Sequence, residues 1–446
     1  MKVVIIGNGI SGITAARWIR KLSDYDIKVI SSESEFFYSR TALMYIYMGH
    51  MRQADTQPYE EWFWKKNRID LHLDHVDNID FSQKRLKLRS GISESYDKLI
   101  IATGSSPNKF GWPGQELEAV HGLYSLQDLE QMEIYSKDLK RAVIVGGGLI
   151  GIEMAEMFRS RNIDVTMLVR ESSYWNNVLP EEEAEMISRH IRKHHIDLRL
   201  GLNLHEILGD EKGKACAVTI KETGERVECA YVGLTAGVSP NVDFLKSTKL
   251  EIDKGILVDE YLQTNIDDVY AIGDCAQVRN PVEGRRSIEA VWYTGRMMGE
   301  RVSKNICGNK KPYDPGIWFN SAKFLDIEYQ VYGTVLPLPP DNHASVVWQD
   351  REKERLIRLV YDSETEDILG FNLLGIRFRH EVCEKWLKEK TNIREVISNL
   401  ALADFNPEFH NSYEIELINK YRELQGIELK VENQRSSNAT IEFLNK

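Results

Sequence analysis

A glycine-rich turn between an apolar strand and a helix is the feature that most constrains this chain, and it occurs twice. The first copy, Gly7-Asn8-Gly9-Ile10-Ser11-Gly12, follows the apolar run Val3–Ile6 and opens a helical stretch to about Leu22. A second apolar run ends at Ile30, so the opening segment predicts a β-α-β unit. In this setting the glycines allow a tight turn and a close approach of backbone to a pyrophosphate, which the helix N-terminus then faces.

The second copy of the turn lies in the middle of the chain. An apolar strand at Ala142–Val145 leads into Gly146-Gly147-Gly148-Leu149-Ile150-Gly151, and a helix then runs to about Arg159 before a further strand at Val165–Val169. Because the same fingerprint recurs in the same strand-to-helix setting, we expect two different dinucleotides. Two such sites indicate a flavin and a nicotinamide.

The residues just past the second strand of each unit are expected to contact a ribose. In the first unit Glu33 can accept hydrogen bonds from the adenosine ribose, and Ser32 is an equally placed alternative. A pyrophosphate and a ribose site together favour FAD over FMN. In the second unit Arg170 stands where an acidic residue would select NAD, and an arginine can meet the 2′-phosphate of NADP. The sequence therefore favours NADPH, although Glu171 could still serve NAD.

Composition and charge exclude several other classes of protein. The formal net charge of −11 opposes attraction to nucleic acid or to anionic membranes. No run approaches the roughly 18 apolar residues of a membrane span, and a strand begins directly after Lys2, so we expect no signal peptide and a cytoplasmic protein. The cysteines are too widely separated to predict a disulfide framework or a zinc site, and we assign no metal ligand. They are Cys216, Cys229, Cys275, Cys307 and Cys383.

The order of these patterns predicts an α/β protein with two Rossmann-like domains and a C-terminal α+β domain. Two more apolar strands, Ile100-Ile101-Ala102-Thr103-Gly104 and Val269-Tyr270-Ala271-Ile272-Gly273-Asp274, each end at a glycine and are expected to join the first sheet. After about Lys311, prolines separate short alternating strands, and a helix is expected from about Phe378 to Glu389. We expect an FAD domain from 1–112 and 237–311, an NAD(P) domain from 113–236, and the C-terminal domain from 312–446.

The whole set of motifs resembles the pyridine nucleotide-disulfide oxidoreductase superfamily of FAD-dependent proteins. Beyond the two glycine turns, the matching pieces are Tyr96–Gly104, Ala236-Gly237-Val238-Ser239-Pro240-Asn241 and Thr264–Ala276. The resemblance implies FAD and NAD(P)H as cofactors and places Asp274 on the ribityl chain of the flavin. Further cofactor contacts are expected at Val76, Ala102, Thr103, Gly104, Gly237 and Gly273.

The segment after the first β-α-β unit indicates a branch of that superfamily. Thiol-using members carry a redox cysteine there, but the stretch from Phe36 to Tyr45 holds none. Its Tyr38-x-Arg40 instead resembles a cysteine-free group that includes ferredoxin and rubredoxin reductases, monodehydroascorbate reductases, the flavin module of assimilatory nitrite reductases and apoptosis-inducing factor. This implies that Arg40 contacts the flavin. The acid-base histidine of the disulfide reductases is also missing, because Asn406 stands in its place and His410 is expected to be a surface residue.

Three residues are the candidates for the reacting centre. The relatives commonly place a lysine where Tyr45 stands, paired with the glutamate that matches Glu153 beside flavin and nicotinamide. Without that lysine, Glu153 is held by Tyr45 or Tyr47, has a pKa raised by burial, or is a plain helix-face glutamate. Trp292 matches an aromatic residue that lies against the isoalloxazine, and the alternative is a core tryptophan.

The expected activity is hydride transfer from NAD(P)H to flavin N5, followed by direct electron transfer to an acceptor without any thiol. The expected acceptor is a ferredoxin- or rubredoxin-type carrier, a quinone or another small molecule. The alternatives are an NAD(P)H oxidase that reduces O2 and a redox-responsive binding protein similar to apoptosis-inducing factor. The C-terminal domain resembles a dimerisation domain, so a homodimer is expected.

Overall fold

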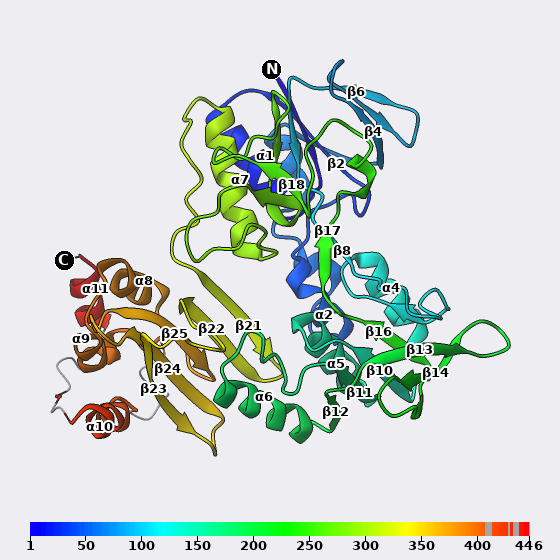
Figure 1. Cartoon of the computed structure of the whole chain (residues 1–446). Helices are drawn as coiled ribbons and strands as arrows, with labels where there is room; N and C mark the ends of the chain where they lie inside the picture. Colours follow the sequence, from blue (N-terminus) through cyan, green and yellow to red (C-terminus); the bar gives the residue numbers. More distant parts are fainter. Residues whose placement is uncertain (406–412, 427–428, 431–436, 446) are drawn as a thin grey trace. The chain divides into compact units, whose positions relative to one another are not determined.

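A computed structural model describes residues 1–405, 413–426, 429–430 and 437–445 of the chain (Figure 1). Contacts between residues divide it into two compact units. The first comprises Met1–Met167 and Asn203–Pro315, and the second comprises Leu168–Leu202 and Gly316–Lys446. Each unit is described by itself below.

The first unit contains a five-stranded parallel sheet that carries the first glycine turn. Its strands lie in the order β19-β7-β1-β2-β3, and β1 pairs in parallel with both β2 and β7. The two strands that end at a glycine are β7 and β19, so their expected place in this sheet is confirmed. The bounds are β1 Lys2–Ile6, β2 Asp26–Ser31, β3 Ile69–Leu73, β7 Lys98–Ile101 and β19 Val269–Ala271.

Helices α1 (Ile10–Leu22) and α7 (Trp292–Ile306) lie side by side (Figure 1). Glycines on α7 permit this approach, because a Cβ at Gly299 would lie 2.5 Å from the main-chain oxygen of Ser11. The hydroxyl of Ser303 donates a hydrogen bond of 2.9 Å to the main-chain oxygen of Ala15 and joins the two helices further along. The start of α7 is thereby held close to the glycine turn at the start of α1.

Shorter elements complete this part of the first unit. The helices are α2 Leu43–Tyr47 and α3 Glu61–Lys66. The strands are β4 Val76–Asp80, β5 Arg85–Leu88, β6 Ser93–Ser95, β8 Ser105–Pro107, β17 Val238–Pro240, β18 Ile256–Val258 and β20 Ala276–Val278. Five 3-10 turns occur in the described chain, at Arg40–Ala42, Gln53–Thr56, Asp243–Leu245, Gly273–Cys275 and Leu400–Leu402.

A second parallel sheet carries the second glycine turn, between β10 and α5 (Leu149–Ser160). β10 pairs in parallel with β16, and β16 pairs in parallel with β9. Helix α4 (Leu126–Tyr135) begins with a capping box, in which Ser125 and Asp128 bind each other's main-chain N–H groups. The five strands are β9 Val120–His121, β10 Arg141–Val145, β11 Asp164–Val169, β12 Ile196–Leu200 and β16 Tyr231–Leu234, and a separate antiparallel sheet holds β13 Leu204–Gly209, β14 Ala215–Ile220 and β15 Arg226–Glu228.

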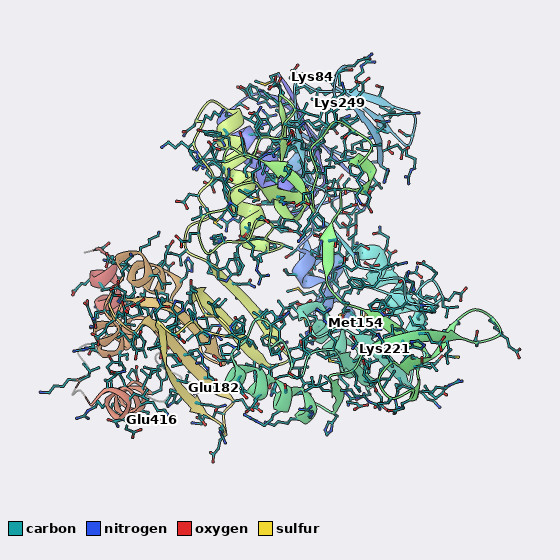
Figure 2. The ribbon with its side chains drawn as sticks, viewed as in Figure 1. Lys84, Met154, Glu182, Lys221, Lys249 and Glu416 are labelled. Carbon is teal, nitrogen blue, oxygen red and sulfur yellow. The ribbon has the colours of Figure 1, made fainter. Side chains whose placement is uncertain are left out.

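The second unit is built on a five-stranded antiparallel sheet in the order β21-β22-β25-β24-β23. Trp386 stacks on Phe371 in its core, with ring centroids 6.1 Å apart. The buried Arg358 pairs with Glu183 at 2.7 Å and with Glu182 at 2.6 Å, which joins β24 to α6 (Glu182 is labelled in Figure 2). The strands are β21 Phe319–Phe324, β22 Ile327–Gly333, β23 His343–Asp350, β24 Arg355–Asp362 and β25 Ile368–Leu374, and the helices are α6 Glu181–Lys193, α8 His380–Glu389, α9 Ile393–Ser398, α10 Glu414–Gln425 and α11 Ser437–Asn445.

The predicted fold class is confirmed, with parallel Rossmann-like sheets followed by an antiparallel sheet with helices. The expected helix at 378–389 is α8. The domain boundaries at 112, 236 and 311 stay predictions. Asn406 and His410 lie outside the described residues. Among the described helices, none combines the length and the apolar composition that crossing a membrane requires.

Candidate active site

A cavity of about 740 Å³ opens at the carboxyl ends of the strands of the first sheet. Ile6 ends β1, Ser31 ends β2, and Ala102 and Ile272 directly follow β7 and β19; all four line the cavity. Open parallel sheets place ligands at this edge, and the volume is in the range of about 300–1,000 Å³ typical of ligand pockets. The cavity therefore has the place and the size of a cofactor site.

The first glycine turn forms one wall of this cavity. Gly7 has φ of +109°, and a Cβ there would overlap the main-chain oxygen of Ala102. A Cβ at Gly12 would overlap the main-chain oxygen of Gly7, so these two glycines pack helix against strand. By contrast, a Cβ at Gly9 would meet no protein atom within 4 Å. Only Gly9 of the three has an open space beside it.

Helix α1 begins at this turn with uncompensated N–H groups. Its N-cap is Gly9, with no side-chain capping bond and no acidic residue in the first turn. Helix α5 likewise has a glycine, Gly148, as its N-cap, with no side-chain capping bond and no acidic residue in the first turn. The first N–H groups of a helix lack intrahelical partners and carry a partial positive charge, so both ends suit an anionic group.

Asn8 fixes the turn against the loop that follows β2. Its side-chain amide donates to the main-chain oxygens of Ser34 at 2.9 Å and Phe36 at 3.1 Å. Its side-chain oxygen accepts a hydrogen bond of 2.9 Å from the hydroxyl of Ser31. Sequence reasoning missed this role, because Asn8 occupies a variable position of the glycine pattern.

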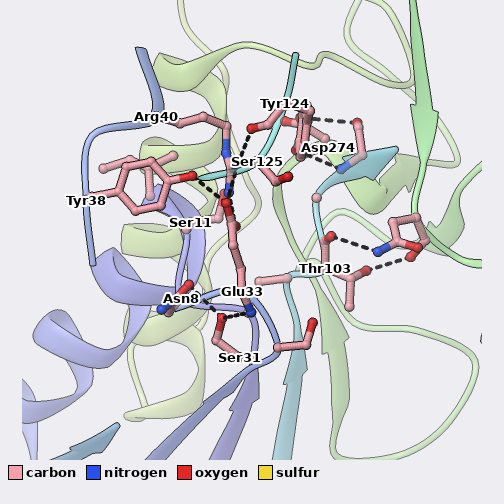
Figure 3. Close-up of a pocket in the computed structure, with 18 of the residues that line it drawn as sticks. Asn8, Ser11, Ser31, Glu33, Tyr38, Arg40, Thr103, Tyr124, Ser125 and Asp274 are labelled. Carbon is pink, nitrogen blue, oxygen red and sulfur yellow. Dashed lines mark hydrogen bonds and ion pairs between the residues drawn. The ribbon is translucent and has the colours of Figure 1, made fainter. Parts of the chain in front are cut away.

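Glu33 reaches the cavity, but its carboxylate is engaged by other protein groups (Figure 3). Arg40 forms an ion pair with it at 2.5 Å, and the hydroxyl of Tyr38 and the main-chain N–H of Leu126 also donate to it. Burial acts to raise the pKa of Glu33, but the hydrogen bond and charge of Arg40 outweigh it, so the pKa lies below its usual range. Ser32 also lines the cavity and is exposed.

Asp274 lines the cavity from the 3-10 turn Gly273–Cys275, which follows β19. The hydroxyl of Ser105 donates to its carboxylate at 3.2 Å, and the main-chain N–H of Ser105 donates to the hydroxyl of Tyr124 at 2.9 Å. Burial raises the pKa of Asp274 above its ordinary value and raises the pKa of Tyr124 to about 12. These groups offer hydrogen-bonding positions to a polar part of a ligand.

The start of helix α5 lines the same cavity through Leu149, Ile150 and Glu153. Trp292, the first residue of α7, also lines it. Tyr45 is not among the lining residues; its ring lies against His50, with centroids 6.2 Å apart. The structure thus brings two of the three candidate catalytic residues to the cavity.

A buried ion pair precedes Trp292 in the chain. Arg285 binds Glu289 through two contacts of 2.7 and 2.6 Å, and both side chains are 7% exposed. The hydroxyl of Thr294, in the first turn of α7, donates to the same carboxylate at 3.0 Å. This pair holds the loop that leads to the cavity. The sequence did not predict it, because residues four positions apart are expected to pair in a helix and not in a loop.

The predicted cofactor residues fall into two groups. Those that line the cavity are Gly7, Gly9, Ile10, Ser11, Ser32, Glu33, Arg40, Val76, Ala102, Thr103, Gly104, Leu149, Ile150, Asp274 and Trp292. Those that do not are Gly12, Gly146, Gly148, Gly151, Arg170, Gly237 and Gly273. Four lining residues from the end of β9 to the first turn of α4 were missed: Leu123, Tyr124, Ser125 and Gln127.

Two residues of the second group show why they stand apart from the cavity. A Cβ at Gly146, where φ is +126°, would lie 2.5 Å from the main-chain oxygen of Thr235, so this glycine serves packing. Arg170 follows β11 directly, with its side chain 75% exposed and paired with Glu171 at 2.8 Å.

In the part of the chain that the structure describes, no cysteine is among the residues that line the cavity. Burial raises the pKa of the thiols of Cys275, Cys307 and Cys383, and raises that of Cys229 to about 12. Cys275 donates to the main-chain oxygens of Ile101 and Ile272. A thiol with a raised pKa is a poor nucleophile at neutral pH, because the thiolate is the reactive form.

Comparison with known proteins identifies the family. The family described as pyridine nucleotide-disulphide oxidoreductase matches residues 1–299. The chain is 30% identical over 400 residues to an NAD(P)H coenzyme A polysulfide/persulfide reductase of Pyrococcus horikoshii, covering 84% of this chain and 87% of that protein. It is 27% identical over 315 residues to a rubredoxin-NAD(+) reductase of Ectopseudomonas oleovorans, covering 70% and 81%.

The fold agrees with this assignment. A solved ferredoxin reductase of Rhodopseudomonas palustris matches with a TM-score of 0.76 at 24% identity, covering 84% of this chain and 91% of that one. The described fold is thus shared with that ferredoxin reductase. The chain is an oxidoreductase that belongs to the pyridine nucleotide-disulphide oxidoreductase family.

Proposed function

We propose that this oxidoreductase binds FAD in the cavity, takes hydride from NAD(P)H, and delivers the electrons directly to a separate acceptor without a redox thiol. The observation that carries the proposal is a cavity lined by the starts of α1 and α5 and, among the described residues, by no cysteine. When bound, FAD supplies a ring that accepts hydride and gives up electrons. The protein supplies position and electrostatics.

The residues of the cavity fit the several parts of FAD. The open space beside Gly9 and the N–H groups at the start of α1 suit the pyrophosphate. The carboxylate of Asp274 is placed to accept hydrogen bonds from ribityl hydroxyls. Because the carboxylate of Glu33 is already engaged by Arg40, we assign the adenosine ribose to Ser32. Arg40 then contacts the cofactor while its charge is balanced by Glu33.

The second glycine turn is proposed to bind NAD(P)H. A Cβ at Gly148 would meet no protein atom within 4 Å, which leaves room for a pyrophosphate as at Gly9. Arg170 is proposed to contact the 2′-phosphate of NADPH. In the structure its guanidinium pairs with Glu171, so phosphate binding would replace that exposed ion pair.

Two residues are proposed at the reacting centre. Trp292 offers a flat apolar surface against which a flavin ring packs, and the pair Arg285–Glu289 holds the loop before it. Glu153, on the inner face of the first turns of α5, is proposed to orient the nicotinamide. A catalytic role for Tyr45 stays a prediction.

A small redox protein of the rubredoxin or ferredoxin type is the acceptor that we favour. The relation to a rubredoxin-NAD(+) reductase supports this choice. A persulfide substrate, as in the name of the Pyrococcus relative, is less favoured because attack on sulfur by a protein thiol would need a cysteine at the cavity.

A panel of acceptors tests the proposal. The purified protein is expected to release FAD, and not FMN, when denatured. After anaerobic reduction with NADPH it is mixed with rubredoxin, a ferredoxin, a quinone, coenzyme A persulfide and O2. We expect reoxidation by a carrier protein to be at least tenfold faster than by O2. Bound FMN would contradict the cofactor assignment, while faster reoxidation by O2 or by the persulfide would contradict the acceptor assignment.

A further inference from the structure

His190 of helix α6, His194 at the C-cap of that helix, and an aspartate in the turn between β21 and β22 form a cluster within the second unit. The Nε2 atom of His190 lies 2.5 Å, and that of His194 3.1 Å, from the same oxygen of Asp326. One ligand atom of each residue lies within 4.8 Å of the others. Residues four apart share a helix face, which accounts for the ring centroid separation of 4.5 Å between the two histidines. Three metal-binding side chains therefore converge on one point.

The second nitrogen of His190 lies beside a carboxylate. Its Nδ1 is 2.8 Å from Glu354, and Lys193 lies 3.2 Å from the other oxygen of that carboxylate. The side chain of His190 is 1% exposed, so packing fixes the orientation of its ring. Histidines that bind metals usually have a carboxylate at their other nitrogen, which fixes the tautomer and directs the free nitrogen to the ion. Glu354 has this place beside His190, as a close contact that does not meet hydrogen-bond geometry.

Helix α6, which leads to both histidines, is fixed to the sheet. Glu183 is fully buried, pairs with Arg358 of β24 at 2.7 Å, and accepts a hydrogen bond of 3.1 Å from Asn372 of β25. At the C-terminal end of the helix, the side chains of His194 and Asp326 are 37% and 72% exposed. One ligand is therefore preorganised and buried, and the other two are accessible to an ion from solvent.

We propose that His190, His194 and Asp326 bind one divalent transition-metal ion, with Zn²⁺ as the first candidate. Two imidazoles and one carboxylate form a donor set suited to zinc, with a further position for water. Ligand atoms about 2.0–2.2 Å from one ion lie roughly 3–3.5 Å apart, so small rotations of the more exposed His194 and Asp326 side chains around the fixed His190 would complete the site. The ion would tie α6 to the β21–β22 turn and stabilise the second unit.

No local sequence pattern predicts this site, because its residues are far apart in the chain. His190 and Asp326 are separated by 136 positions. A His-x-x-x-His spacing on a helix is common without a metal, and only the fold supplies the third ligand. The alternative arrangement is a metal-free network in which the two histidines contact Asp326 and His190 also contacts Glu354.

Zinc binding by the full-length, FAD-loaded protein tests the proposal. After treatment with EDTA and its removal, ZnCl2 is titrated by calorimetry, and bound zinc is counted by elemental analysis. The variants are His194→Gln and Asp326→Asn, both at exposed side chains, and the matched control is His195→Gln, an exposed neighbour outside the cluster. Flavin content and circular dichroism verify that each variant is folded.

We expect one zinc ion per chain in the wild type and in His195→Gln, and an affinity at least tenfold weaker in His194→Gln and Asp326→Asn. Zinc should also raise the unfolding temperature of the wild type and of the control, but not of the two cluster variants. The metal-free network would replace this proposal if the wild type bound no zinc, or if all four proteins bound it equally.

Discussion

Gly7 and Gly9 lie in one turn but differ in what surrounds them. At Gly7 both the positive φ and the carbonyl of Ala102 exclude any side chain, whereas at Gly9 the backbone is extended and the neighbouring space is open. We therefore expect Gly7→Ala to prevent folding. Gly9→Ala should fold, with the stability of the apoprotein within about 0.5 kcal/mol of the wild type, and should lose FAD affinity at least tenfold.

Flavin content after gel filtration and thermal unfolding of the apoproteins measure these effects. Gly9→Ala with a full complement of tightly bound FAD would contradict the placement of the pyrophosphate at this turn.

The exposed guanidinium of Arg170 is proposed to choose between the two nicotinamide cofactors. A charge-assisted hydrogen bond is worth about 1.5–3 kcal/mol, and a side chain that is 75% exposed should give the lower end of this range. Arg170→Ala should then lower kcat/KM for NADPH about tenfold and that for NADH less than twofold. Steady-state kinetics with both cofactors check this. As a control, Glu171→Gln removes the competing carboxylate and should preserve the use of NADPH. Equal losses of kcat/KM with both cofactors in Arg170→Ala would show that Arg170 is a solvated cation and does not bind the 2′-phosphate.

At the scale of elements, the two glycine turns give a matched pair of variants. Gly148 resembles Gly9 in its open surroundings and in its place as the N-cap of a helix, here α5. Gly148→Ala should raise KM for NAD(P)H at least tenfold while FAD stays bound. The added methyl group would occupy the space proposed for the pyrophosphate of NAD(P)H. A variant that loses FAD and keeps its KM would reverse the assignment of the two turns.

The elements themselves follow closely from the apolar pattern. The strand predicted at Val3–Ile6 and the helix predicted to Leu22 are β1 and α1. The glycine turns could be predicted because few other residues can adopt their backbone conformation. The site depended on more distant pairings. Tyr124 approaches Arg40 from a separate segment 84 positions away, and no local pattern predicts that contact. The ion pair between Glu33 and Arg40, only seven positions apart, was missed for another reason: each side chain was predicted to contact the cofactor and not the other side chain.

For the whole molecule, the resemblance of the C-terminal domain to a dimerisation domain predicts a two-fold homodimer with an isologous interface. Light scattering at micromolar concentration should give about twice the 51.4 kDa of one chain. A stable monomer under these conditions would contradict the predicted homodimer.

The proposed electron transfer needs no thiol, and a reductive titration of a cysteine-free variant tests this. All five cysteines are changed to Ser or Ala. Three of them are buried, so a loss of stability of about 1 kcal/mol from poorer packing is expected at each. The variant is used only if it retains FAD. Under anaerobic conditions NADPH or NADH is added stepwise while the flavin absorbance is followed. We predict that two electrons per FAD reduce both the wild type and the variant fully, with no thiolate charge-transfer band and with hydride-transfer rates within a few-fold. Direct electron transfer would be contradicted if the wild type required four electrons per FAD. It would also be contradicted if the hydride-transfer rate of the variant fell by several orders of magnitude.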